Sequence, residues 1–257
     1  MRRKPVYKYV NDKKMEANVD STLEWLRSLN ENEFYAEIKS TISIHKNLFG
    51  GINGNDNDVS GVIRDKDIGI LFLTEGNVLK RKTLYPPSSI PVLMKRYAGY
   101  IDRLRDQKEG DVNEAFSNLC AITILFFRAH PFFDGNGRVY RTVIISLCER
   151  LGFQMSRKWK VYPRPYDKHF SYSIRHFRRN PHILYGILRG YITVAGSISR
   201  ADTEGDDESK TIFETVSETI DNYEEQDKFL DENGDAYNDD AWLHESDFDF
   251  FEYLETI

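Results

Sequence analysis

The chain has 257 residues, of which 40% are hydrophobic and 30% charged, and its net charge is −6. This size fits one domain with a core of its own, and the lack of any run of eighteen apolar residues excludes a membrane-spanning class. The cysteines, Cys120 and Cys148, lie in separate helical patterns with no paired spacing, so neither a disulfide framework nor a zinc site is indicated, and a reducing, cytoplasmic compartment is favoured.

The net charge combines two oppositely charged parts. Residues 202–257 contain 21 acidic and two basic residues, a charge of −19, whereas residues 1–201 carry +13. We therefore divide the chain into a basic N-terminal segment at 1–19, a central domain at 20–200 and an acidic tail at 201–257. A basic body attracts an acidic tail at short range, but such charge runs are more typical of disordered or partner-binding segments.

Apolar spacing along the central domain predicts a mostly α-helical fold. Ser21 followed by Glu24 matches a capping box, which predicts a helix from Ser21 through Leu29, and helical spacing continues from Phe34 to Leu48. Short apolar runs on either side of a turn predict a β-hairpin at 68–84. The other predicted elements are a loop at 50–58 and helices at 90–104, 113–129, 139–151, 166–177 and 181–198.

The residues best suited to binding and catalysis lie between the helices predicted at 113–129 and 139–151. Two glycines there reach backbone angles closed to other residues, so successive N–H groups can bind an anion at the start of the next helix. Arg138 and Arg141 share a face of that helix, and planar guanidinium groups suit phosphate oxygens. The full motif reads His130-Pro131-Phe132-Phe133-Asp134-Gly135-Asn136-Gly137-Arg138 and is closed by Arg141.

Two residues of this motif supply chemistry in addition to binding. Asp134 offers a hard oxygen ligand, which suits a Mg²⁺ ion that bridges substrate phosphates. His130 ordinarily titrates near neutrality and can take a proton from an attacking hydroxyl group. The motif therefore predicts a triphosphate site with a general base beside it.

The motif resembles the signature of the Fic family, part of the Fic/Doc superfamily, whose pattern is His-Pro-Phe-x-Asp/Glu-Gly-Asn-Gly-Arg-x-x-Arg. Every fixed position is filled here. The flanks at 44–49 and 61–64 are similar too, so the resemblance covers roughly residues 20–198. It implies a Fic-type helical bundle with the hairpin at 68–84 as a flap over the active site. For His45, at the helix end, a packing role is favoured over a catalytic one.

The resemblance implies a protein adenylyltransferase. Such an enzyme moves AMP from ATP to a Tyr, Thr or Ser hydroxyl of a target protein captured by the flap, and releases pyrophosphate. His130 is then the base, Asp134 the Mg²⁺ ligand, and Phe132 an anchor buried in the core. The implied nucleotide-binding residues are Gly135, Asn136, Gly137, Arg138 and Arg141, with Tyr166 either near the nucleobase or simply packed at the surface.

Several alternatives remain open. The motif fixes phosphates and not the base, so transfer of UMP, GMP, phosphocholine or phosphate fits the same scaffold. An inactive binding module, neutralised by an antitoxin-like partner, is a second alternative. A nucleic-acid binder is disfavoured by the −19 tail. Ser217–Asn222 loosely matches an inhibitory helix, with Asp221 in place of glutamate, so the tail could mask Arg138 and Arg141. Action in the cell's own cytoplasm and delivery into a host as an effector both remain open.

Overall fold

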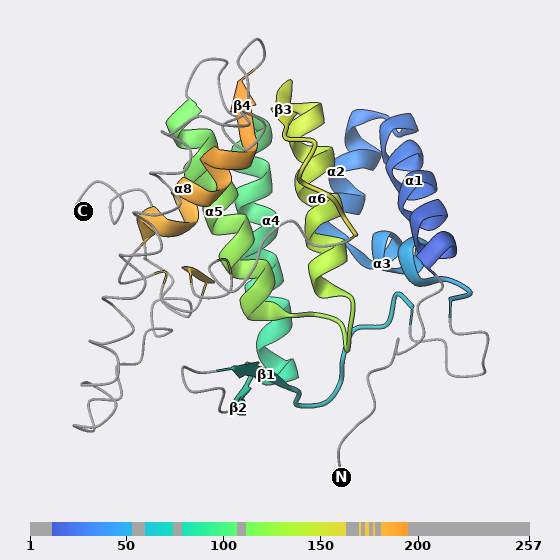
Figure 1. Cartoon of the computed structure of the whole chain (residues 1–257), viewed down its shortest axis with the longest axis vertical. Coiled ribbons are helices and arrows are strands. Elements are labelled where there is room, and N and C mark those ends of the chain that lie inside the picture. The colour runs from blue at the N-terminus through green and yellow to red at the C-terminus, as the bar shows by residue number, and fades with distance from the viewer. Residues whose placement is uncertain are drawn as a thin grey trace. The chain divides into compact units, whose positions relative to one another are not determined.

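The fold is mostly helical, as the sequence predicts, with two small antiparallel sheets (Figure 1). The computed structural model describes residues 12–52, 60–73, 79–106, 112–162, 170, 173, 174, 177 and 181–194, and in the strands between 69 and 83 it describes the backbone alone. The helices are α1 (Asp12–Ser28), α2 (Glu31–Ser40), α3 (Ile42–Phe49), the 3₁₀ turn η2 (Pro87–Ser89), α4 (Ile90–Asp106), α5 (Val112–Ala129), α6 (Asn136–Arg150) and α8 (Pro181–Tyr191). The strands are β1 (Gly69–Leu73), β2 (Leu79–Thr83), β3 (Phe153–Met155) and β4 (Ile192–Val194).

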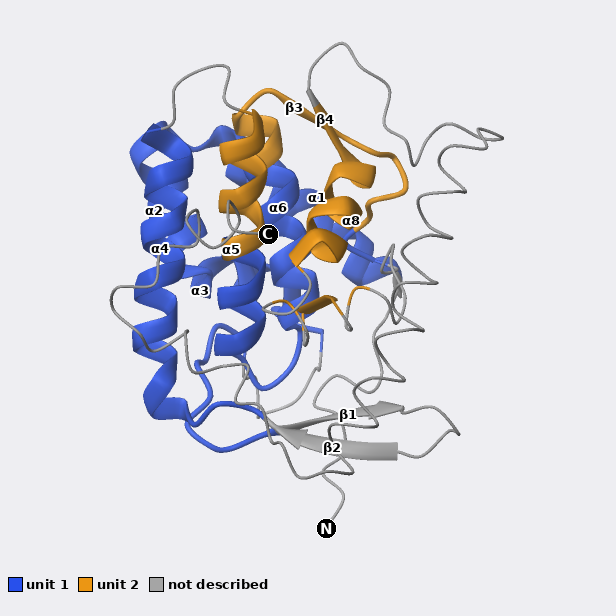
Figure 2. Cartoon of the chain, turned by 90° about the vertical axis from the view of Figure 1, so that its left-hand side faces the viewer, with its two compact units in different colours: residues 1–106, 122–147, 161–163 blue, residues 107–121, 148–160, 164–257 orange. Residues whose placement is uncertain are grey.

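The chain divides into two compact units (Figure 2). The first comprises residues 1–106, 122–147 and 161–163, and it contains α1 to α4, the β1–β2 hairpin, the C-terminal part of α5 and most of α6. The second comprises residues 107–121, 148–160 and 164–257, with the first half of α5, strands β3 and β4, and α8.

The first helix begins earlier than the sequence predicts. Because α1 starts at Asp12 and crosses residue 20 without a break, the prediction that Ser21 caps a helix start is wrong. The Ser21 hydroxyl instead donates to the carbonyl of Ala17, one turn back in the same helix (2.8 Å). A capping box does occur at α2, where Asn30 and Glu33 each bond the other's backbone N–H. A capping box is therefore present in this region, but it is formed by other residues and opens the second helix.

The single helix predicted over 34–48 is broken at Thr41, where φ is +61°. The N–H group of Thr41 closes α2 on the carbonyl of Glu37, and its own carbonyl accepts from His45 at the start of α3. A β-branched residue in the left-handed region is strained, and here it is fully buried. The break redirects α3, which carries His45 and Phe49.

Helix α1 supports the end of α3. The Asn18 amide donates to the carbonyl oxygens of Leu48 (3.0 Å) and Gly50 (3.4 Å), and the Lys14 ammonium donates to that of Gly51. The last carbonyl groups of a helix lack partners within the helix, so these bonds satisfy polar groups that would otherwise depend on water.

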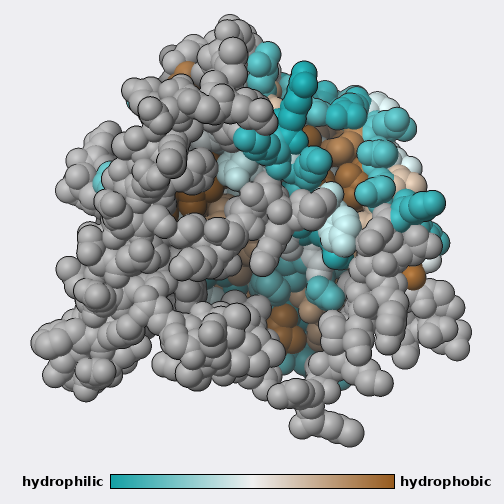
Figure 3. Space-filling model, in the orientation of Figure 1, coloured by the Kyte–Doolittle hydropathy of each residue, from teal (hydrophilic) through white to brown (hydrophobic). Residues whose placement is uncertain are grey.

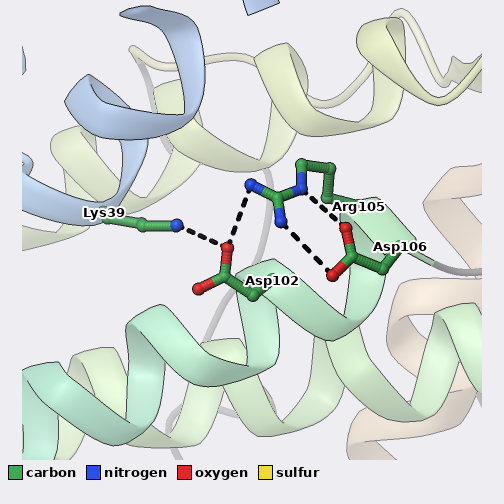
Figure 4. A network of polar contacts seen from close by, with 4 residues as sticks. All are labelled: Lys39, Asp102, Arg105 and Asp106. Carbon is green, nitrogen blue, oxygen red and sulfur yellow. Dashed lines mark hydrogen bonds and ion pairs between the residues drawn. The ribbon is translucent and has the colours of Figure 1, made fainter. Parts of the chain in front are cut away.

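Buried side chains position α2 against α4. The Tyr97 hydroxyl donates to the carbonyl of Ile38 (3.0 Å) from a fully buried site. A surface network also joins the helices, in which Asp102 contacts both Lys39 and Arg105 (Figure 4). Exposed ion pairs contribute little to stability. The helix pair therefore depends mainly on its apolar core, which includes Phe34, Ile38, Leu93, Tyr97, Ile101 and Leu104.

The predicted hairpin is present. Strands β1 and β2 pair antiparallel, from Gly69 with Thr83 to Leu73 with Leu79, and the Leu84 N–H extends the ladder to the carbonyl of Ile68 (3.0 Å). Pro86 and η2 then lead into α4.

In the second unit the helix predicted over 181–198 ends at Tyr191, and Ile192–Val194 forms a strand with β3. A β-branched run of Ile, Thr and Val favours a strand, which accounts for the difference. The backbone N–H of Ser156 donates to the carbonyl of Tyr191 (2.8 Å), and Trp159 packs against the Tyr191 ring. The helix predicted over 166–177 falls largely outside the described residues.

Few large hydrophobic side chains are exposed among the described residues. On the face in Figure 3, hydrophilic side chains surround small hydrophobic areas, and the large hydrophobic residues exposed in the described part are Ile42, Val62 and Val92. None of the described helices has the length and apolar character needed to cross a membrane.

We expect Asn18→Ala to lower the free energy of unfolding by about 1 kcal/mol, because two carbonyl groups at the end of α3 lose their donor. Ser21→Ala is the matched control on the same helix. It should leave the free energy unchanged or raise it slightly, since alanine is the better helix former. Urea unfolding of both variants measures this. A loss of about 1 kcal/mol in Ser21→Ala would mean that Ser21 is a cap after all.

Candidate active site

The motif occupies the loop between α5, which ends at Ala129, and α6, which begins at Asn136. Two residues of this loop have left-handed backbone angles, His130 with φ +42° and Gly135 with φ +81°. The middle of the loop forms an isolated antiparallel bridge between Phe132 and Ile63. All of these residues belong to the first unit.

The Asn136 side chain holds the loop closed. Its oxygen accepts from the N–H of Phe132 (3.0 Å), and its amide nitrogen donates to the carbonyl of the same residue (2.8 Å). The Phe132 ring is completely buried, as the family resemblance implies for the anchor. The Asn136 side chain therefore shapes the loop, and what this residue can offer a ligand is its backbone N–H.

His45 is buried and links Gly61 to the motif loop through its two ring nitrogens. Its Nδ1 accepts from the N–H of Gly61 (2.7 Å), so its Nε2 carries the proton and donates to the carbonyl of Asp134 (3.0 Å). The ring also stacks on Phe132 at 4.0 Å between centroids and is 1% exposed. With both nitrogens engaged by backbone, His45 has the packing role favoured from the sequence.

Gly135 is required by its surroundings as well as by its φ angle. A Cβ atom at this position would lie 2.4 Å from two ring carbons of Phe49, which is fully buried. The same Phe49 ring lies 5.4 Å from the guanidinium carbon of Arg138, and the Tyr162 ring lies 5.2 Å from it. Aromatic faces attract guanidinium groups and thereby orient them. Phe49 thus links the loop to the first motif arginine.

Arg141 lies beneath the first turn of α6. It is 5% exposed, and its Nε donates to the carbonyl of Val161 (2.9 Å). One terminal nitrogen would be only 3.2 Å from a Cβ at Gly137, so the missing side chain there leaves room for the guanidinium group. Both motif arginines therefore lie in the first two turns of α6.

The start of α6 has the features of an anion site. The first intrahelical bonds are made by Arg138 and Val139, both to the carbonyl of Gly135, so the N–H groups of Asn136 and Gly137 precede the helical ladder. Such N–H groups and the helix dipole favour an anion, and two guanidinium groups in the first turns add to this.

His130 is a half-buried base at the end of α5. Its N–H donates to the carbonyl of Phe126 (2.8 Å), which continues the helix up to the motif. Burial, together with the nearby charge of Arg64, lowers the pKa of His130 to about 4, although a hydrogen bond with the backbone of Phe127 opposes this shift. The imidazole is therefore neutral at pH 7 and able to accept a proton.

Asp134 supplies one carboxylate to this site. Its Oδ1 accepts from the N–H of Gly135 (2.6 Å), and the side chain is half-exposed. Within the part of the chain that the structure describes, no three His, Cys, Asp or Glu side chains are grouped to hold a metal ion. A single hard oxygen fits a Mg²⁺ ion that takes its other ligands from phosphates and water, and does not fit a site made by protein alone.

The structure adds three residues that the sequence reasoning did not assign to the site. Phe49 and Tyr162 flank Arg138, and Arg64 bonds the His130 carbonyl. Arg64 ends the flank at 61–64 that resembles the family, but nothing in the sequence indicated its partners. Tyr166 and the acidic tail, for which an inhibitory contact was one open alternative, lie outside the described residues.

Residues 35–148 match the family model described as Fic/DOC family. This part of the chain is a Fic/DOC family domain. The match includes the whole motif and also Arg64, the hairpin and α4. No curated protein has a sequence that matches the chain significantly.

Two solved structures share the fold. One is the BepC protein, a VirB-translocated effector from Bartonella tribocorum, with bound AMPPNP; it is 16% identical, with a TM-score of 0.51 over 74% of this chain and 92% of its own. The other is the N-terminal Fic domain of a putative cell filamentation protein from Bartonella quintana with bound ADP, at 15% identity and a TM-score of 0.51, covering 72% of this chain and 86% of its own. The Fic-type helical fold with a hairpin is confirmed.

We expect Gly135→Ala to lower the free energy of unfolding by about 2 kcal/mol or more, because the new methyl group collides with Phe49 and the φ angle of +81° becomes strained. Gly99→Ala in α4 is the control: a Cβ there meets nothing within 4 Å, so the variant should gain about 0.5–1 kcal/mol from helix propensity. Equal stability of the two variants in urea unfolding would contradict the packing described.

The lowered pKa of His130 predicts a pH dependence of stability. The unfolded chain binds the proton near pH 6.5 and the folded chain near pH 4, so the free energy of unfolding falls as the pH drops through this window, by at most about 3 kcal/mol. In His130→Gln this contribution is absent. Urea unfolding from pH 7 to pH 4.5 should therefore show a smaller decline in the variant than in the wild type. Parallel curves would show that His130 has an ordinary pKa.

Proposed function

We propose that this Fic domain is a protein adenylyltransferase, which transfers AMP from ATP to a Tyr, Thr or Ser hydroxyl of a target protein. The observation that carries the proposal is the neutral imidazole of His130 in the same short loop as an anion site at the start of α6. A base and a phosphate site held by one loop are what nucleotidyl transfer requires.

The triphosphate would bind at the start of α6. Backbone N–H groups of Asn136 and Gly137 can donate to phosphate oxygens, and Arg138 and Arg141 supply positive charge that stays at any physiological pH. Because Arg138 is oriented by Phe49 and Tyr162, its guanidinium group needs little reorganisation to meet a phosphate. The AMPPNP and ADP bound in the two similar Fic structures agree with nucleotide as the ligand class.

His130 would act on the target hydroxyl. Its imidazole takes the hydroxyl proton as the oxygen forms a bond to the α-phosphorus of ATP, and the bond from that phosphorus to the β-phosphate oxygen breaks. Pyrophosphate is the leaving group. Asp134 would hold a Mg²⁺ ion, which supplies neutralisation of the charge that grows on the leaving phosphates.

The hairpin would receive the target. Strands β1 and β2 pair only with each other among the described strands, so each has an edge at which an extended segment can add as a further strand. This mode reads the main chain of the target and leaves its side chains free, including the hydroxyl that His130 would deprotonate.

The experiment is mass spectrometry of proteins from a cell lysate after incubation with the purified chain, Mg²⁺ and ATP. We expect a peptide that gains the mass of AMP with the wild type, and a 10²- to 10⁴-fold lower rate with His130→Ala. A different added mass would identify UMP, GMP, phosphocholine or phosphate transfer instead. Modification that is unaffected by His130→Ala would contradict the proposed mechanism.

Measurements of nucleotide affinity distinguish the role of the base from the role of the phosphate-binding residues. By titration calorimetry, His130→Ala should bind ATP within about threefold of the wild type, whereas Arg138→Ala should lose roughly tenfold or more, as expected when a charge-assisted contact is removed. Arg150→Ala, an exposed arginine at the other end of α6, is the control for loss of one positive charge. Equal affinity of Arg138→Ala and Arg150→Ala would place the phosphates elsewhere.

A further inference from the structure

Arg64 is a buried cation whose guanidinium group is held by backbone carbonyl oxygens. It is 1% exposed, and its guanidinium group donates four hydrogen bonds, each to a carbonyl oxygen. Burial lowers the pKa of this group, with partial compensation from Asp67. Holding a charge in such a place is costly, and the cost is offset only when its donors are satisfied in good geometry.

Two of the four bonds go to the stem of the hairpin. One terminal nitrogen donates to the carbonyl of Lys66 (3.2 Å), before β1, and the other donates to that of Tyr85 (2.6 Å), after β2. Between these positions the hydrogen bond from Leu84 to Ile68 closes the ladder. Arg64 therefore binds the chain on both sides of the hairpin, just before β1 and just after β2.

The other two bonds go to the end of α5 and the first residue of the motif. The Nε donates to the carbonyl of His130 (2.8 Å), and a terminal nitrogen donates to that of Ala129 (3.1 Å). The backbone N–H of Arg64 adds a bond to the carbonyl of Pro131 (2.8 Å). The successive carbonyl groups of Ala129, His130 and Pro131 are thus fixed by one residue, around a histidine whose φ of +42° is unusual and needs support from its surroundings.

From this geometry we propose that Arg64 is a positioning residue, which fixes the backbone of His130 relative to the hairpin stem. This inference rests on the proposed function: a target strand added to the hairpin would then present its hydroxyl group to an imidazole that is already in position. The planar fork of arginine suits this task because it donates in several directions at once. A lysine ammonium, a single point at the end of a flexible stem, cannot span both sets of carbonyl groups.

The test compares Arg64→Lys and Arg64→Met with the wild type in the full chain. Tyr97→Phe is the control for stability, since it removes one buried hydrogen bond of the same unit, which joins α4 to α2 and does not involve the motif backbone. Circular dichroism establishes that each variant folds, and if Arg64→Met does not fold, Arg64→Lys decides. The readouts are kcat and KM for ATP, and the NMR signals of His130, assigned by their absence in His130→Ala.

We expect kcat for transfer to fall roughly thirtyfold or more in Arg64→Lys while KM for ATP stays within about threefold, because the base is misplaced and the phosphate site is intact. Tyr97→Phe should keep the wild-type kcat. The backbone and ring signals of His130 should move in Arg64→Lys, whereas those of the exposed His182 on α8 should not.

Wild-type kcat in Arg64→Lys, with His130 signals at their wild-type positions, would overturn the inference. So would a fall in kcat matched by Tyr97→Phe, which would reflect stability alone. If the wild type itself shows no transfer, the proposed function fails, and the NMR comparison still decides the role of Arg64: displaced His130 signals support it and unchanged signals refute it.

Discussion

Two hydrogen bonds between the Asn136 side chain and the backbone of Phe132 determine the shape of the motif loop. They tie the start of α6 to a fully buried ring, so the loop cannot move without exposing that ring to water. The left-handed turn at Gly135 and the leading N–H groups of α6 follow from this closure, and they give the start of α6 the features of an anion site. The functional residues are thus held by a residue whose own side chain faces inward.

Buried polar residues connect this loop to the rest of the first unit. His45 reaches the carbonyl of Asp134 from α3, and Arg64 reaches that of His130 from the segment before the hairpin. Both donate to backbone carbonyl groups, so neither occupies the Asp134 carboxylate. Burial is the main cause of the lowered pKa of His130, and the positive charge of Arg64 adds to it. A bound triphosphate would bring negative charge nearby and raise the pKa of His130 towards the range in which a base is most effective.

Local sequence patterns predicted much of the fold and the motif, and failed where long-range contacts decide. Apolar spacing predicted α4 and α5 because their buried faces are continuous. The same spacing runs across Thr41, whose left-handed angle has no signal in a threonine, so the break there was not predicted. Ser21 and Glu24 match a capping box by spacing alone, inside a longer helix. Arg64 meets His130 across 66 positions of sequence, and no local pattern encodes such a contact.

We propose that the motif loop and the start of α6 form a triphosphate site with His130 as its base. A crystal structure of the chain with Mg²⁺ and a non-hydrolysable ATP analogue tests it most directly. We predict phosphate oxygens on the N–H groups of Asn136 and Gly137, a Mg²⁺ ion about 2.1 Å from an Asp134 oxygen, and the His130 ring facing the α-phosphate. A nucleotide bound elsewhere, or with its phosphates away from the start of α6, would contradict the claim.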